Sequence, residues 1–345
     1  MDDTTLRDGD AVLLAAEVAA QQGRWGAAIE IVNEGLADHD ERRLFDPRLE
    51  PSLVDLRAKG LDGVGEPRPD WPPDYPDVFA GGAGPPEIER ADLDELRLGS
   101  ALQHHGSLLV RGLLEPSSAA SLLDDARRSM AVAERSEAVG EADSVWYRPF
   151  EPEDADYTLY FARQAALISQ CLLLVESPRT LRNTVELYRG AGLGDVIASY
   201  LGEWPALSVK KSTIRSAGPQ CVTRWHQDGA FLGTDVRTVN IWAALTPAGV
   251  DAPGLEHFDF RFDHLVEAGT QDADAGWAVG DSVARTYGSD RMVTPAFEPG
   301  DALLFDQMSL HRAHVTPEMT ETRFALESWF FAPSCYPQEQ RPLLF

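Results

Sequence analysis

Residues 323–332 read RFALESWFFA, the last of four short runs that decide the fold. The other three are LSVKKSTIRS (207–216), TVNIWAAL (238–245) and DALLFDQMSLH (301–311). These runs contain many β-branched or aromatic residues, and Gly, Pro and Asp punctuate the sequence around them, which is typical of β-strands. Several such strands in succession predict a β-sandwich or a jelly roll for the second half of the chain.

The first half of the chain has helical patterns instead. Two short helices are predicted within residues 11–37, with Gly23 between them, and this hairpin resembles one tetratricopeptide unit. Further helices are predicted over 116–130 and 177–190, each with a proline suited to its first turn. Helices followed by many strands indicate the α+β class.

Residues 63–87 separate the two parts of the chain. This stretch holds seven of the 23 prolines and has no regular periodicity, which is typical of a linker. The predicted organisation is an N-terminal helical segment (1–62), a Pro/Gly-rich linker (63–87) and one large domain (88–345). A single helical hairpin cannot bury both of its faces, so the N-terminal helices could offer a docking surface to a protein partner.

The charge of the chain excludes several classes of partner. It has 30 Lys and Arg against 56 Asp and Glu, a net charge of −26. Such a surface repels phosphate backbones and anionic headgroups, so neither nucleic acid nor a membrane is an expected partner. The three cysteines are scattered, and no signal peptide or run of about 18 apolar residues is visible. A cytoplasmic location is therefore expected.

The segment WHQDG (225–229) has the residue types of a metal site. On a strand, His226 and Asp228 point to the same face. The run at 301–311 ends with a histidine that could complete the set. Two histidines and a carboxylate leave three octahedral positions open, as in non-haem Fe(II) oxygenases. His314 competes with His311 for this role, but strand alternation favours His311.

Arg323 follows His311 by twelve residues. An arginine presents a rigid fork that pairs bidentately with a carboxylate. Because Arg323 shares a strand face with Ala325 and Glu327, it is predicted to point into the barrel. There it could bind the distal carboxylate of a metal-bound 2-oxo acid.

From about residue 85 to the C-terminus, the chain resembles the phytanoyl-CoA dioxygenase family of Fe(II)/2-oxoglutarate-dependent oxygenases. The matching motifs are GSLLVRGLLEPSSAASLLDDAR (106–127), WHQDGAFLG (225–233), VNIWAALTPAGVDAPGLE (239–256) and EPGDALLFDQMSLHRAHVTPEMTETRFALESWF (298–330). The resemblance implies a double-stranded β-helix (jelly-roll) core with flanking helices and the N-terminal hairpin. It also implies Fe(II) bound by His226, Asp228 and His311, with 2-oxoglutarate anchored by Arg323.

The resemblance further implies that Trp242 lines the 2-oxoglutarate pocket, with Asn240 on the same face. One position departs from the family pattern. Many members carry a small hydroxyl residue two places after the distal histidine, where this chain has Ala313. Other groups must then supply its hydrogen bonds. The candidates alternate along the strand predicted at 207–216, and they are Lys211, Thr213 and Arg215.

These features together predict an Fe(II)/2-oxoglutarate-dependent dioxygenase that uses O₂ and releases succinate and CO₂. The expected reaction is hydroxylation of a small organic substrate, with desaturation or another oxidation as a variant. Related halogenases have a small residue at the position of Asp228, so its carboxylate favours hydroxylation. No catalytic residue is expected beyond the metal site. Two alternatives stay open, a cupin-like metal enzyme that does not use 2-oxoglutarate and a non-catalytic interaction protein on the same fold.

The long loop-like segment at 259–292 lies between the two halves of the predicted metal site. Loops over such a site commonly choose the substrate. We therefore expect this segment to form a lid, with Arg261, Trp277 and Tyr287 as substrate contacts.

Overall fold

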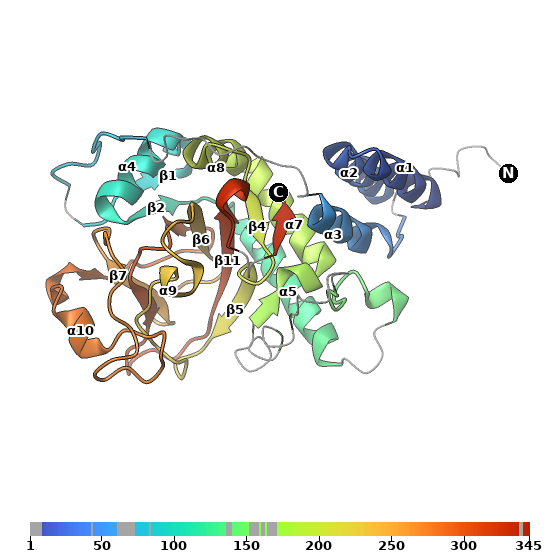
Figure 1. Ribbon diagram of the computed structural model, residues 1–345. Helices are drawn as coiled ribbons and strands as arrows, with labels where there is room; N and C mark the ends of the chain where they lie inside the picture. Colours follow the sequence, from blue (N-terminus) through green and yellow to red (C-terminus); the bar gives the residue numbers. More distant parts are fainter. Residues whose placement is uncertain are drawn as a thin grey trace.

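The computed structural model describes residues 9–42, 44–60, 73–82, 84–135, 140–151, 159, 163, 171–337 and 341–345. Within these residues most helices come early in the chain and most strands come late, as Figure 1 shows. No described helix is long and apolar enough to cross a bilayer. Residues 63–72 of the predicted linker lie outside the described residues.

The described part of the N-terminal segment contains three helices, whereas the sequence pattern predicts two within 11–37. Helices α1 (Gly9–Gln21) and α2 (Trp25–Glu41) pack together through small and aliphatic side chains. Gly23 between them has a φ of 72°, a left-handed conformation that glycine adopts without strain. The third helix, α3 (Leu49–Lys59), packs on α2.

Helix α3 also joins this segment to the rest of the protein. It contacts α7 (Pro178–Gly190) and the C-terminal strand β12 (Pro342–Leu344). The buried Arg57 donates a hydrogen bond of 2.6 Å to the Leu344 carbonyl. The N-terminal helices are therefore anchored on the main body, beside its C-terminus (Figure 1).

One large, mostly antiparallel sheet contains nine of the described strands. Besides β12 they are β1 (Glu87–Glu89), β2 (Ser107–Arg111), β3 (Cys171–Leu173), β4 (Ala206–Ser208), β5 (Thr213–Ala217), β6 (Thr238–Ala244), β9 (Ala302–Phe305) and β11 (Arg323–Phe331). Their hydrogen-bonded order is β1-β2-β9-β6-β11-β4-β12, and β5 lies between β11 and β3.

A second, smaller sheet has the order β10-β7-β8 among the described strands. Its members are β7 (Gly254–Phe258), β8 (Met292–Val293) and β10 (His311–His314). The remaining described helices with assigned bounds are α4 (Glu95–His105), α5 (Pro116–Glu134), α8 (Leu193–Leu201), α9 (Gly229–Leu232) and α10 (Asp281–Arg285).

Strand β11 shows how alternation divides the protein into layers. Its even-numbered residues pack toward the helices. The Tyr188 hydroxyl of α7 donates a 2.9 Å hydrogen bond to Ser328, and the Tyr188 and Phe330 rings lie 5.8 Å apart. The other face of the sheet carries the odd-numbered residues Arg323, Ala325, Glu327 and Trp329.

The strand predicted at 207–216 is interrupted. The backbone N–H of Lys211 donates a 3.2 Å hydrogen bond to the Ser208 hydroxyl, which closes a turn between β4 and β5. Lys210 and Lys211 therefore lie in this turn, and the prediction that they alternate on a strand is wrong.

The run predicted at 301–311 also divides. The Asp306 carboxylate accepts a 2.9 Å hydrogen bond from the backbone N–H of Met308, in the turn between β9 and β10. His311 therefore begins a strand of the smaller sheet. His314 is the last residue of the same strand.

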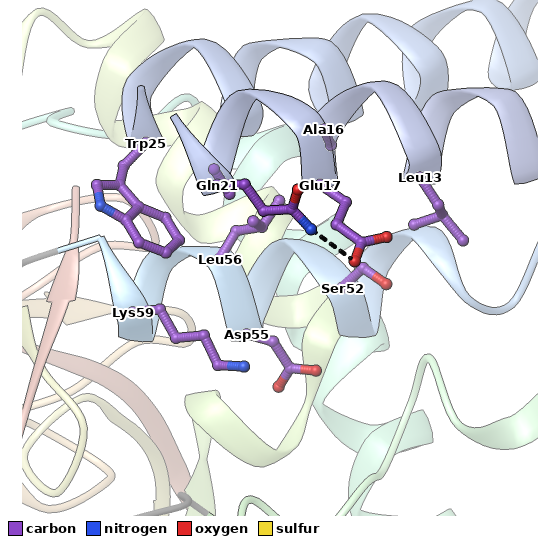
Figure 2. Close-up of a pocket in the computed structure, with 10 residues that line it drawn as sticks. Leu13, Ala16, Glu17, Gln21, Trp25, Ser52, Asp55, Leu56 and Lys59 are labelled. Carbon is purple, nitrogen blue, oxygen red and sulfur yellow. Dashed lines mark hydrogen bonds between the residues drawn. The ribbon is translucent and has the colours of Figure 1, made fainter. Parts of the chain in front are cut away.

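The N-terminal helices enclose a groove of about 530 Å³. Leu13 and Ala16 of α1 face Ser52 and Leu56 of α3 across it (Figure 2). The groove shares no lining residue with the metal-ligand candidates, so the chemistry of the protein lies elsewhere. The expected protein partner for these helices stays a prediction.

Candidate active site

The structure brings His226, Asp228 and His311 together from two distant segments of the chain. One ligand atom from each of these side chains lies within 4.8 Å of the others. The backbones of His226 and His311 form an antiparallel bridge with two hydrogen bonds of 3.0 Å. Asp228 precedes the short helix α9, whose first N–H, that of Gly229, bonds the Gln307 carbonyl. Backbone pairing thus sets the positions of all three side chains.

Both histidines are oriented by their Nδ1 atoms. Nδ1 of His226 lies 2.9 Å from the Arg224 carbonyl, and Nδ1 of His311 lies 3.0 Å from the Ser309 carbonyl. A carbonyl oxygen can only accept a hydrogen bond, so each Nδ1 donates, and in the neutral imidazole Nε2 then has the lone pair for a metal. Burial, with help from the nearby His311, lowers the pKa of His226 to about 4. The imidazole is therefore neutral at pH 7, the form that binds a metal.

Asp228 is buried and is held by Lys211. Its Oδ2 lies 3.7 Å from Nε2 of His311, while its Oδ1 lies 3.5 Å from Nζ of Lys211. Burial alone would raise the pKa of Asp228, but Lys211 and the two histidines lower it below its usual value. The carboxylate is therefore ionised. The sequence placed Lys211 among the 2-oxo acid contacts, whereas the structure places it on a metal-ligand candidate.

We expect replacement of Lys211 by methionine to weaken metal binding by about 10- to 100-fold, the usual contribution of groups that orient metal ligands. Anaerobic titration with Co(II), followed by visible absorption, gives the dissociation constant. Lys59→Met, which removes a lysine from the N-terminal groove, is the matched control. Unchanged or tighter Co(II) binding by Lys211→Met would mean that Lys211 does not support Asp228.

One face of the large sheet carries buried polar atoms without partners, and we call this part of the sheet the wall of the site. They belong to Arg323 (Nε and Nη1), Trp242 (Nε1), Asn240 (Oδ1) and Thr213 (Oγ1), none of which has a hydrogen-bond partner among the described residues. An unsatisfied buried polar group typically costs about 1–3 kcal/mol. Four of the five residues predicted to hold a co-substrate thus carry polar atoms that a ligand would satisfy.

Strand register explains why these residues share one wall. Glu327 pairs with both Trp242 and Thr213, and Trp329 pairs with Asn240. Residues opposite each other in an antiparallel sheet point to the same face. This is the face of Phe305, whose ring lies 4.8 Å from the His311 ring. The wall and the three metal-ligand candidates therefore lie on the same side of the sheet.

Arg323 is the most constrained member of the wall. It is 3% exposed, and its guanidinium lies 4.9 Å from the centre of the Trp242 ring. Burial lowers its pKa to about 10, so it remains charged at pH 7. A buried charge without a carboxylate is destabilising. The site therefore fits an anionic ligand.

Two exposed aromatic residues stand beside His226. Trp277 lies 5.5 Å from the His226 ring and Phe231 lies 6.3 Å from it, and both side chains are about 40% exposed. The sequence predicted Trp277 as a contact but not Phe231, although Phe231 follows Asp228 by three residues, about one helical turn.

The other two predicted lid contacts have structural partners. Arg261 bonds the buried Asp306 at 2.8 Å, across the turn that precedes β10. Tyr287 packs 5.0 Å from the Phe262 ring within an aromatic cluster. Both side chains hold the 259–292 segment in place, and their expected contact with a substrate stays a prediction.

The fold and the site together define a protein in which three candidate metal ligands, His226, Asp228 and His311, lie together on one side of a large β-sheet. The family model for phytanoyl-CoA dioxygenase (PhyH) matches residues 102–317, well over half of the chain. The chain belongs to the phytanoyl-CoA dioxygenase family.

Solved structures similar to this chain include AviO1 from Streptomyces viridochromogenes Tue57, with 17% identity over 70% of this chain and 96% of that one and a TM-score of 0.44. The carbocyclase SnoK from nogalamycin biosynthesis has 14% identity over 71% and 86%, with a TM-score of 0.42. EvdO2 from Micromonospora carbonacea var. aurantiaca, complexed with 2-oxoglutarate, has 16% identity over 66% and 86%, with a TM-score of 0.43. No curated protein matches the sequence.

Proposed function

We propose that this protein is an Fe(II)/2-oxoglutarate-dependent dioxygenase that hydroxylates a small organic substrate. His226, Asp228 and His311 would bind Fe(II), and Arg323, Trp242, Asn240 and Thr213 would hold 2-oxoglutarate. The observation that carries the proposal is the buried Arg323, which has two unpartnered nitrogens on the same side of the sheet as the three metal-ligand candidates. We interpret the two sheets as a jelly roll, in keeping with the family.

The donor set suits this metal. Two neutral imidazoles and one carboxylate leave three octahedral positions, enough for a bidentate 2-oxo acid and O₂. When bound, Fe(II) would supply the redox chemistry that places one oxygen atom of O₂ in the substrate and the other in succinate, with release of CO₂.

The side chains of this chain would do the positioning. Lys211 holds one oxygen of Asp228, which leaves the other free for the metal. Arg323 would fix the distal carboxylate of the 2-oxo acid, and Trp242 shields that guanidinium from water. Because Asp228 occupies a ligand position, it leaves no place for a halide there. This favours transfer of oxygen over transfer of a halogen.

Anaerobic addition of Fe(II) and 2-oxoglutarate tests the proposal. We expect a weak visible charge-transfer band that needs both components, because only a direct chelate of the 2-oxo acid produces it. Zn(II) in place of Fe(II) is the control and should give no band. Fe(II) binding without the band would indicate a metal enzyme that does not use 2-oxoglutarate. Failure to bind Fe(II) would indicate a non-catalytic protein.

A further inference from the structure

A second arginine lies on the wall that carries Arg323. Arg215 is on β5, an internal strand of the large sheet, directly opposite Ala325 of β11. Arg323 pairs with Ala217, so Arg215 and Arg323 are diagonal neighbours on the same face. Such neighbours lie about 7–8 Å apart at their Cα atoms, within reach of long side chains.

Small residues leave room for these two side chains. Ala325 pairs with Arg215 on one side and with Ala244 of β6 on the other, and Ala217 lies opposite Arg323. Three methyl groups therefore occupy the centre of a wall that elsewhere carries larger side chains. Arg215 stays exposed to solvent despite its internal strand. A ligand can reach its guanidinium.

The charges around Arg215 are unbalanced. Glu327, its diagonal neighbour on the side away from Arg323, raises the pKa of Arg215. Among the described residues, no carboxylate lies within 4.0 Å of the Arg215 guanidinium. Two guanidinium groups against one carboxylate leave a net positive charge on this part of the wall. One additional carboxylate would neutralise it.

We propose that Arg215 is a second anchor for the distal carboxylate of 2-oxoglutarate, acting beside Arg323. The proposal rests on the function proposed above. Lys211 is engaged with Asp228 and Ala313 has no hydrogen-bonding side chain, so Arg215 and the Thr213 hydroxyl are the groups on β5 that can add to the contact made by Arg323. Along the chain, Arg215 lies two residues from Ala217, the partner of Arg323, and four residues from Lys211, which contacts Asp228.

The test compares 2-oxoglutarate with 2-oxobutyrate, which can form the same chelate but lacks the distal carboxylate. Both are titrated anaerobically into the Fe(II)-loaded protein, and the charge-transfer band gives each dissociation constant. We expect Arg215→Gln to weaken 2-oxoglutarate binding about 10- to 100-fold, as for loss of a charge-assisted hydrogen bond. Binding of 2-oxobutyrate should change less than about twofold, because it never contacts Arg215.

Two further variants complete the experiment. Arg215→Lys keeps the charge and should recover part of the 2-oxoglutarate affinity. Arg24→Gln removes an arginine that bonds Gln22 near the N-terminal helices, and it should change neither constant. Retained 2-oxobutyrate binding shows that a variant is folded around an intact metal site.

The outcomes separate this inference from the proposed function. Unchanged 2-oxoglutarate affinity in Arg215→Gln would overturn the role of Arg215 and leave the function standing, with Arg215 then free for the substrate. Equal losses for both acids would also overturn it, because Arg215 would then support the fold or the metal. If the wild-type protein gives no band with either acid, the proposed function itself fails.

Discussion

Replacing Asp228 with alanine is expected to abolish the formation of succinate and CO₂ from 2-oxoglutarate. The substitution removes one of the three proposed metal ligands, and it leaves Lys211 near the imidazoles of His226 and His311 with no carboxylate to offset its charge. Loss of a group that merely supports a ligand costs 10- to 100-fold in metal affinity. Loss of the ligand itself should therefore cost more than about 100-fold.

Succinate release and the Co(II) dissociation constant measure this effect together. Asp124→Ala is the control, because Asp124 is an exposed residue of α5 that makes only a loose ion pair of 3.8 Å with Arg127. It should match the wild-type protein in both measurements. Turnover that persists in Asp228→Ala at wild-type metal occupancy would refute the ligand assignment, whatever metal the protein prefers.

Replacing Arg323 with methionine is expected to change function and stability in opposite directions. Affinity for 2-oxoglutarate should fall about 100-fold or more, because a bidentate, charge-assisted contact is lost. The free energy of unfolding of the ligand-free protein should rise by about 1–4 kcal/mol, because a buried charge without a carboxylate partner gives way to an apolar side chain of similar length.

Arg111 offers a matched control for the effect on stability. Unlike Arg323 it is only partly buried, and it bonds Glu87 and Asp301 at 2.8 and 2.7 Å. Arg111→Met breaks a satisfied network and should lower the free energy of unfolding by about 1–3 kcal/mol. Urea unfolding of both variants, without added metal or 2-oxo acid, makes the comparison. If Arg323→Met is destabilised as Arg111→Met should be, Arg323 has a structural role and is not held ready for a ligand.

Local patterns predicted much of the helical part of the chain. Pro116 and Pro178 begin α5 and α7 at the predicted residues, because proline suits the first turn of a helix. Ser177 directly precedes α7, and its side chain makes no capping hydrogen bond. Helix α3 was missed, because its apolar residues are interrupted by Pro51 and charged side chains, and its burial comes from packing on α2 and α7.

Strand alternation predicted that Arg323, Ala325 and Glu327 share one face of their strand and that Asn240 lies on the face of Trp242. The register of β6 and β11 brings these two sets to the same side of the sheet. A prediction based on alternation is wrong where the chain turns out of the sheet partway through the run. The turns at Ser208 and Asp306 contain side-chain hydrogen bonds from the backbone N–H groups of Lys211 and Met308, and no periodicity signals such bonds. For this reason the runs at 207–216 and 301–311 read as continuous strands.

The sequence by itself determined the chemical identity of the site, namely the residue types of the His-x-Asp pair, the distal histidine and the arginine that follows it. These residue types can be recognised locally, because they depend only on the spacing of residues within one segment. Only the tertiary structure decided that Lys211 meets Asp228, that Arg215 lies diagonal to Arg323, and that Phe231 joins Trp277 beside His226. These contacts join distant segments through backbone pairing and loop packing, so they form and stabilise the protein only once the sheets have formed.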